Sequence, residues 1–418
     1  MRIILHSDMN SFYASCEALY HPEFLNCPLA VGGDEKNRHG IILAKNQLAK
    51  GYGVKTGEAL WEARKKCPDL VIVPPNFERY HRFSKKAKKI YYDYTNQVES
   101  YGLDECWLDC TGSKIHGSGE EIAHKIRNRI KTELGLTVSI GVSYNKIFAK
   151  FGSDYKKPDA VTVITPQNYK TLVWDQPVED LLYVGRATKK KLCGVGINTI
   201  GKLAQVSPEI LERKLGKMGR VLWGFANGLD DSPVKAMSES KFDNQRLVKS
   251  ISNGITTPRD LENIDDVKMV LGILGESVAM RLREAQCTGQ VIGIQVRGKS
   301  LRSFTRQVKL DRPTNITKEI IQSAVALFKR NYDFSEPIRS LGVQVSDLTF
   351  GDFPIQISLF EDIEERQKQE SLDKTLDGLK KRFGNTIVQR GSAMPLKGDW
   401  LRGKDPKKDH IIHPLGYF

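Results

Sequence analysis

Three acidic residues stand where predicted strands end, and acids in such places can support metal-dependent chemistry. Asp8 closes the apolar run that opens the chain, which is typical of a buried strand. Asp104 and Glu105 lie at the tight junction between two short predicted strands, 97–103 and 106–110. If these strands are neighbours, the three carboxylates converge, and burying such a cluster is costly unless cations neutralise it. Mg²⁺ prefers hard oxygen ligands, so we expect two magnesium ions at these acids. In proteins such ions commonly also bind the phosphate groups of a substrate.

Each acid taken singly also has an ordinary explanation. An Asp after an apolar strand is commonly a turn or helix-cap residue, and an adjacent Asp-Glu pair is commonly solvated surface. The sequence around the acids favours catalysis. Segments 8–17 (DMNSFYASCE) and 103–109 (LDECWLD) resemble the two active-site segments of the Y-family, translesion DNA polymerases. From residue 1 to about 350 the chain is similar to the DNA polymerase IV (DinB-like) branch, with some fingers features of the UmuC-like branch.

The resemblance implies a DNA-directed DNA polymerase that performs low-fidelity translesion synthesis by two-metal nucleotidyl transfer, in DNA damage tolerance and mutagenesis. Asp8 and Asp104 would bridge both Mg²⁺ ions, Glu105 would serve the ion at the primer end, and the backbone carbonyl of Met9 would also bind metal. Many relatives carry Asp where this chain has Asn10.

Further residues are assigned to the incoming dNTP through the same resemblance. Tyr13 would be the steric gate that excludes a ribose 2′-hydroxyl, with Phe12 as its support. Lys157, the lysine before a proline, and Lys50 would bind the triphosphate. At the positions where DinB-type relatives usually show Thr, Tyr and Arg, this chain has Ala44, Gln47 and Lys50. An ordinary core aromatic and ordinary surface lysines are the alternatives.

Composition limits the classes of protein to consider. The chain has 418 residues, a formal net charge of +14 and a sequence pI of about 9.3, which favour several domains and a polyanionic partner. No apolar run approaches the roughly 20 residues of a membrane span, and no signal peptide is evident, so we expect no membrane partner. The seven cysteines form no Cys-x-x-Cys pair, which indicates reduced thiols and a cytoplasmic protein.

The expected fold class is α+β and multidomain. A ferredoxin-like βαββαβ palm with an antiparallel sheet receives inserted small fingers, and a helical helix-hairpin-helix thumb and an α/β little finger follow. The expected boundaries are palm 1–10 and 77–165, fingers 11–76, thumb 166–232, linker 233–248, little finger 249–350, and clamp-binding motif with C-terminal extension 351–418. Strands at 290–296, 303–310 and 341–348 and helices at 317–328 and 363–383 are predicted from periodicity.

Two regions are expected to contact primer-template DNA without sequence preference. The predicted thumb contacts are glycine turns and basic residues of two helical hairpins: Lys189, Lys190, Gly194, Gly196 and Lys217. The predicted little-finger contacts are Arg297, Arg302 and Arg306, on strands rich in basic residues. An ordinary helix turn with a glycine cap and a charged strand edge are the corresponding alternatives.

The segment 356–360 (QISLF) resembles the short peptide by which bacterial polymerases bind the sliding clamp, or β subunit. Leu359 and Phe360 would fill an apolar pocket while Gln356 provides a polar anchor. We expect a monomer held to DNA by this tether. Two other classes stay open: a DNA-binding, clamp-tethered scaffold with little catalysis of its own, and a nucleotide cyclase built on the same palm.

Overall fold

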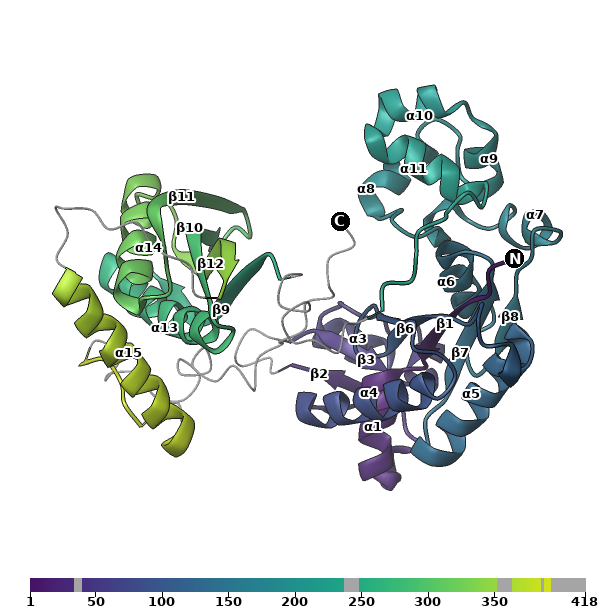
Figure 1. Ribbon diagram of the computed structural model, residues 1–418, viewed down its shortest axis with the longest axis horizontal. Helices are drawn as coiled ribbons and strands as arrows, with labels where there is room; N and C mark the ends of the chain where they lie inside the picture. The colour runs from purple at the N-terminus through teal and green to yellow at the C-terminus, as the bar shows by residue number, and fades with distance from the viewer. Residues whose placement is uncertain (34–39, 237–247, 352–362, 385–386, 392–418) are drawn as a thin grey trace. The chain divides into compact units, whose positions relative to one another are not determined.

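The computed structural model describes residues 1–33, 40–236, 248–351, 363–384 and 387–391 (Figure 1). The described chain forms two compact units. The first contains residues 1–32 and 42–236, and the second contains 33, 40–41, 248–351, 363–384 and 387–391. Each unit has its own hydrophobic core, which confirms the prediction of a multidomain α+β protein.

A five-stranded sheet is the centre of the first unit, with strand order β5-β6-β1-β7-β8. Its elements are β1 (Ile4–Met9), α4 (Phe77–Tyr92), β5 (Val98–Ser100), β6 (Glu105–Asp109), α5 (Gly119–Leu134), β7 (Val138–Ser143), α6 (Lys146–Tyr155) and β8 (Val161–Val163). The order from β1 to β7 is the expected βαββαβ plan, and these strands pair antiparallel. The predicted antiparallel sheet is correct for these strands but not for β8, because α6 crosses over and delivers β8 parallel to β7.

Side-chain alternation along the strands sorts the helices of this sheet onto two faces. Leu5 and Leu108 belong to the core beneath α4 and α5, whereas their neighbours Ile4 and Trp107 pack with Ala149 of α6 on the other face. The contact with α6 is close, because a Cβ at Gly141 of β7 would lie 1.9 Å from the backbone oxygen of Ala149. The sheet therefore fixes α6, and with it the lysines that follow along this helix.

A small layer is inserted between β1 and α4. It contains α1 (Phe12–Tyr20), β2 (Leu29–Gly32), β3 (Ile42–Lys45), α2 (Gln47–Gly51), α3 (Leu60–Lys66), β4 (Val71–Val73) and the 3-10 helix η1 (Pro22–Phe24). Its three strands follow the order β3-β2-β4. Asn46 caps α2 by accepting a hydrogen bond from Ala49 N, so the last residue of β3 and the first of α2 are held at one corner.

Short helices make up the rest of the first unit: α7 (Tyr169–Val173), α8 (Arg186–Cys193), α9 (Ile200–Gln205), α10 (Pro208–Leu215) and α11 (Lys217–Ala226), with 3-10 helices η2 (Lys114–His116) and η3 (Val178–Asp180). Both predicted hairpins are present. The α8–α9 turn contains Gly196 at φ +79° and the α10–α11 turn contains Gly216 at φ +67°, where glycine is favoured. Gly194 has φ −62°, so its backbone conformation does not require glycine.

The second unit is a four-stranded antiparallel sheet with helices on one face (Figure 1). The strands are β9 (Ser250–Leu261), β10 (Cys287–Gly298), β11 (Ser303–Thr314) and β12 (Ile338–Phe350), in the order β11-β10-β12-β9. The helices are α13 (Ile264–Glu284) and α14 (Thr317–Asn331). The specific sequence predictions did not include β9 and α13. A third helix, α15 (Ile363–Phe383), was predicted with these bounds and docks through Asp373, which accepts from Thr317 N at 2.8 Å and pairs with Arg283.

No helix in the described ranges has the length and apolar character needed to cross a membrane. In the same ranges the seven cysteines are all free thiols.

Candidate active site

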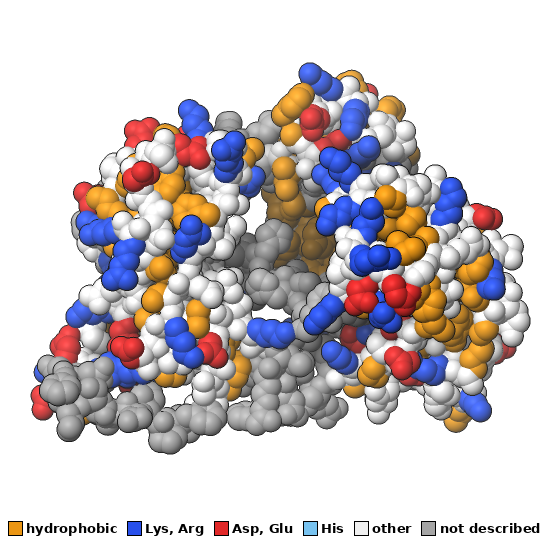
Figure 2. All heavy atoms as spheres, turned by 90° about the horizontal axis from the view of Figure 1, so that it is seen from above, with side chains coloured by type: hydrophobic (Ala, Val, Ile, Leu, Met, Phe, Trp, Pro, Cys, Tyr) orange, Lys and Arg blue, Asp and Glu red, His pale blue; other side chains and the backbone are white. Residues whose placement is uncertain are grey.

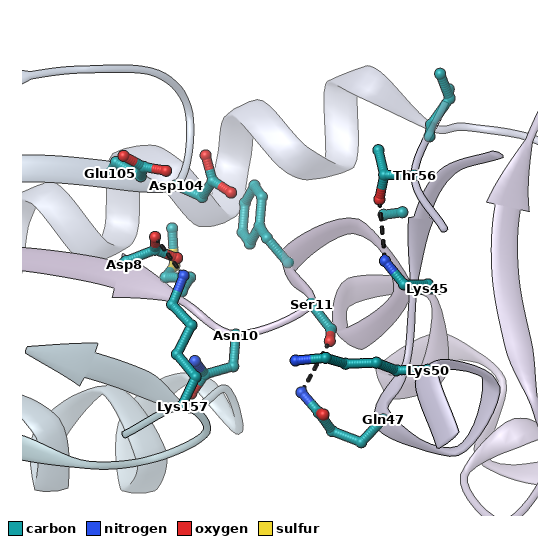
Figure 3. Close-up of a pocket in the computed structure, with 14 residues that line it drawn as sticks. Asp8, Asn10, Ser11, Lys45, Gln47, Lys50, Thr56, Asp104, Glu105 and Lys157 are labelled. Carbon is teal, nitrogen blue, oxygen red and sulfur yellow. Dashed lines mark hydrogen bonds and ion pairs between the residues drawn. The ribbon is translucent and has the colours of Figure 1, made fainter. Parts of the chain in front are cut away.

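The three acids singled out from the sequence lie together at one end of the palm sheet (Figure 3). Asp8 on β1 is directly opposite Glu105 on β6 in the antiparallel register. Asp104 immediately precedes β6, and its backbone oxygen accepts a hydrogen bond from Met9 N at 3.1 Å. Strand pairing therefore brings residues almost a hundred positions apart into one cluster.

Crowding and burial perturb the ionisation of these carboxylic acids. Burial, followed by the charges of Asp8 and Glu105, raises the pKa of Asp104 from 3.8 to about 7. Burial and the Glu105 charge also raise the pKa of Asp8. Burial opposes ionisation of Glu105 as well, but the adjacent His6 ring and the Lys150 ammonium outweigh it and lower its pKa to about 2. Glu105 is therefore the acid that ionises most easily, whereas ionisation of Asp8 and Asp104 is opposed by burial and by the neighbouring carboxylates.

Sequence reasoning missed two residues that hold Glu105 and Asp8. His6 is fully buried, accepts or donates a hydrogen bond with Ser153 Oγ at 2.9 Å, and places its Nε2 atom 3.4 Å from Glu105 Oε2. Lys150 on α6 places its Nζ atom 3.2 Å from Asp8 Oδ2 and 3.1 Å from Glu105 Oε2. The only sequence signal for them was position: His6 is two residues before Asp8, and Lys150 follows one turn after the start of a predicted helix.

The acids form one wall of a cavity of about 290 Å³, and cationic side chains of the inserted layer line the opposite wall (Figure 3). Lys50, predicted as a triphosphate ligand, lines this cavity, as do Ala44 and Gln47. Lys45 was not predicted as a site residue, yet it also lines the cavity. Burial, followed by the charge of Lys50, lowers the pKa of Lys45, whose Nζ atom donates a hydrogen bond to Thr56 Oγ1 at 3.2 Å.

Lys157 reaches the cavity from the loop after α6. Its Nζ atom lies 2.6 Å from Asp8 Oδ2 and 2.7 Å from Asp154 Oδ1. The ammonium therefore stands at the border between the acidic wall and open space, where a phosphate could replace a carboxylate as its partner.

Asn10 has a structural use in this chain. Its buried amide donates to Ser139 Oγ at 2.9 Å and accepts from Asp159 N at 2.9 Å. An Asp side chain at this position would lose the donor to Ser139 when ionised. The amide thus links the end of β1 and β7 to the loop that carries Lys157.

The two aromatic residues after Asp8 occupy different places. Phe12, assigned as the support, lines the cavity and is buried. Tyr13, assigned as the gate, is not among the described residues that line it and stacks on Tyr80 with ring centroids 4.2 Å apart and planes inclined by 8°. Burial, followed by the Asp104 charge, raises the pKa of Tyr13 to about 12, so its phenol stays protonated.

The residues predicted to contact DNA lie on exposed surfaces. In the thumb candidate, Lys189 and Lys190 of α8, Gly194, Gly196 and Lys217 are exposed, although Lys189 also pairs with Glu179. In the second unit, Arg297, Arg302 and Arg306 are exposed on or beside β10 and β11. Blue Lys and Arg side chains are spread over the face drawn in Figure 2, with fewer acidic ones between them. The predicted clamp-binding residues Gln356, Leu359 and Phe360 lie outside the described residues.

The donor set suits hard divalent cations. Asp8, Asp104 and Glu105 line the same cavity and offer carboxylate oxygens, the ligands that hard divalent cations prefer. As the side chains stand, however, no three His, Cys, Asp or Glu residues in the described ranges are arranged to hold a metal ion, and lysine ammonium groups pair with the acids instead.

Comparison with known proteins identifies the class of this fold and site. Residues 7–154 match the impB/mucB/samB family, residues 248–359 match the C-terminal domain of that family, and residues 179–230 match the DNA polymerase-iota thumb domain. A solved Y-family DNA polymerase chimera has the same fold, with a TM-score of 0.72 and 23% identity over 84% of this chain and 100% of the other.

Relatives that align over nearly the whole chain identify its family. DNA polymerase IV of Acetivibrio thermocellus is 52% identical over 95% of this chain and 98% of its own, and DNA polymerase IV 2 of Bacillus subtilis is 40% identical over 95% and 96%. The chain belongs to the Y family of DNA polymerases, in the DNA polymerase IV (DinB-like) branch. It is accordingly an enzyme of the DNA-directed DNA polymerase class, and the resemblance inferred from its motifs is confirmed.

Proposed function

We propose that this polymerase performs translesion synthesis by two-metal nucleotidyl transfer, in DNA damage tolerance and mutagenesis. The observation that carries the proposal is the cavity in which Asp8, Asp104 and Glu105 face Lys45 and Lys50. Acids beside cations suit a ligand that combines divalent ions with a triphosphate. The small inserted layer supports low fidelity, because a limited fingers domain offers little surface to check the nascent base pair.

Asp8, Asp104 and Glu105, together with the backbone carbonyl of Met9, would hold the two magnesium ions. When bound, the two ions would lower the pKa of the primer 3′-hydroxyl and neutralise the triphosphate and its leaving pyrophosphate. His6, at 3.4 Å from Glu105, would hold this carboxylate in place.

The lysines would position the dNTP. Lys157 would exchange Asp8 for the β- and γ-phosphates, and Lys50 would bind the same phosphates from the opposite wall, assisted by Lys45. Phe12 borders the space for the sugar, and Tyr13 would act as the steric gate from its stacked position on Tyr80. A ribose 2′-hydroxyl would then meet an aromatic wall.

The partners proposed are primer-template DNA, dNTP and the sliding clamp. The exposed basic residues on the thumb and on β10 and β11 would bind phosphates, and residues 356–360 would bind the clamp. The proposed state is a cytoplasmic monomer, which agrees with a full set of free thiols in the described chain.

Primer extension with Mg²⁺ and dNTPs tests the proposal. We expect Asp104→Ala to abolish extension, because a carboxylate that would hold the metal ions is removed, whereas Asp109→Ala at the far end of β6 should retain it. Asp109 Oδ1 instead accepts a hydrogen bond from Thr111 N at 2.9 Å, and Asp109 Oδ2 lies 3.9 Å from Arg2 Nη2. Unchanged extension by the Asp104 variant would refute the assignment and favour a scaffold with little catalysis of its own.

A further inference from the structure

Two lysines place their ammonium groups among the acids, where they neutralise negative charge that a bound metal ion would otherwise neutralise. Lys150 forms ion pairs with Asp8, Glu105 and Asp154, at 3.2, 3.1 and 3.0 Å. Lys157 pairs with Asp8 and with the other oxygen of Asp154. The Lys150 side chain is only 12% exposed, so water screens these contacts weakly.

The helix that carries Lys150 is packed too closely against the sheet to shift. Helix α6 begins after Asn145, whose side chain caps Phe148 N, and it packs against β1 and β7. Gly141 and Gly152 permit this approach, with the Cβ of a residue at 152 lying 3.1 Å from the Gly141 Cα. Any change of partner by Lys150 must therefore come from rotation of its side chain.

Asp154 provides a second partner for both ammonium groups. It lies one turn after Lys150 on α6, where i and i+4 side chains meet, and its side chain is half exposed on the solvent side of the cluster. Asp8 and Glu105 need cations, whereas Asp154 can also be hydrated.

We propose that Lys150 is a positioning residue that serves as the resident counter-ion of the acid cluster and competes with divalent ions for it. Lys150 stabilises the metal-free site by pairing with Asp8 and Glu105. When an ion binds to these two acids, Lys150 gives up both contacts and keeps only its pair with Asp154. The same exchange releases Lys157 from Asp8, which makes its ammonium available to phosphate. This inference rests on the proposed metal site.

The alternative is a purely structural ion pair that holds the acids in the arrangement that ions require. The two roles predict opposite changes in ion affinity. Removing a competitor tightens ion binding, whereas removing a support weakens it. A neighbouring unit charge changes the proton affinity of a carboxylate by roughly ten- to a thousandfold. We therefore expect a change of at least about tenfold in Mg²⁺ affinity when Lys150 loses its charge.

The experiment measures Mg²⁺ binding to the full chain without DNA or nucleotide, by calorimetric titration and by the shift in melting temperature on replacing chelator with Mg²⁺. Lys150→Met should lower the melting temperature in chelator, tighten Mg²⁺ binding about tenfold or more, and show a larger Mg²⁺-dependent rise. Lys150→Arg should restore wild-type affinity, because it restores the charge.

Lys156→Met is the matched control, since this neighbouring lysine is exposed and makes no ion pair in the described structure. It should bind Mg²⁺ like the wild type. Asp154→Asn provides a second variant at a half-exposed position, where folding is less sensitive. Loss of the alternative partner should keep Lys150 on the acids and weaken Mg²⁺ binding severalfold.

Equal or weaker Mg²⁺ binding by Lys150→Met would overturn the competing role, even with the metal site intact. Unchanged binding by Asp154→Asn would overturn the transfer to Asp154. If the wild type shows no Mg²⁺ binding that Asp104→Ala removes, the proposed metal site fails and the inference fails with it. The comparison of wild type with Asp104→Ala therefore separates the two kinds of failure.

Discussion

Replacing Asp104 with Asn should abolish catalysis and stabilise the metal-free protein at alkaline pH. The reason is the raised pKa of Asp104, which is about 7 in the folded chain against an ordinary value of 3.8. Between these two pH values the unfolded chain has released the proton while the folded chain keeps it. Stability therefore falls as pH rises through this window, and the loss is complete above about pH 7.

The size of the effect follows from the two pKa values. A difference of about three pH units corresponds to about 4 kcal/mol of lost folding free energy at pH 8, and to about 2 kcal/mol at pH 5. The amide introduced by Asp104→Asn cannot ionise and avoids this loss. The variant should therefore be more stable than the wild type at pH 8 by up to about 4 kcal/mol, and the advantage should shrink by about half at pH 5.

Urea unfolding in chelator, followed by tryptophan fluorescence, provides the assay. Four tryptophans (61, 107, 174 and 223) lie in the first compact unit, so fluorescence mainly reports the unit that contains the site. Asp109→Asn, at the far end of β6, is the control and should give no stabilisation at pH 8. A variant at Asp104 that is equally stable or less stable than the wild type at pH 8, or a gain that does not depend on pH, would refute the reasoning.

Three further predictions concern the gate, the tether and the thumb. Tyr13→Ala should reduce discrimination between dNTP and rNTP by about tenfold or more in single-nucleotide incorporation, and a larger loss for Phe12→Ala would transfer the gate to the residue that lines the cavity. Deletion of residues 356–360 should leave basal extension intact and remove stimulation by the sliding clamp; equal stimulation of both proteins would contradict the tether. Gly219→Ala should destabilise the first unit by about 1–3 kcal/mol, because its Cβ would lie 2.1 Å from Leu211 O. Gly224→Ala, on the same helix with no described atom within 4 Å of its Cβ, should be neutral or stabilising by up to about 1 kcal/mol, and a similar loss for both variants would show that close packing is not the cause.

Local patterns were sufficient for much of the architecture. The 3.6-residue periodicity of 363–383 predicted α15 with the bounds that the structure has, and the strand around Asp8 followed from its apolar run. Helix α13 was missed because 13 of its 21 residues are buried, so its sequence lacks the polar face that reveals an amphipathic helix. The parallel pairing of β8 depends on a crossover, which periodicity does not report.

The sequence by itself determined the family, the expected metal-ligating acids and the lysines expected to bind the triphosphate, Lys50 and Lys157. These assignments depend only on residue types in a local order. Only the tertiary structure decided which charges meet. The strand register places His6 beside Glu105, and the packing of α6 on β1 places Lys150 beside Asp8. Lys45 belongs to the site because it lines the cavity. Asn10 likewise found its partners in β7 and in the loop after α6. Such contacts join residues up to about 150 positions apart, and electrostatic interaction depends on distance in space and on burial, neither of which is written in a local pattern.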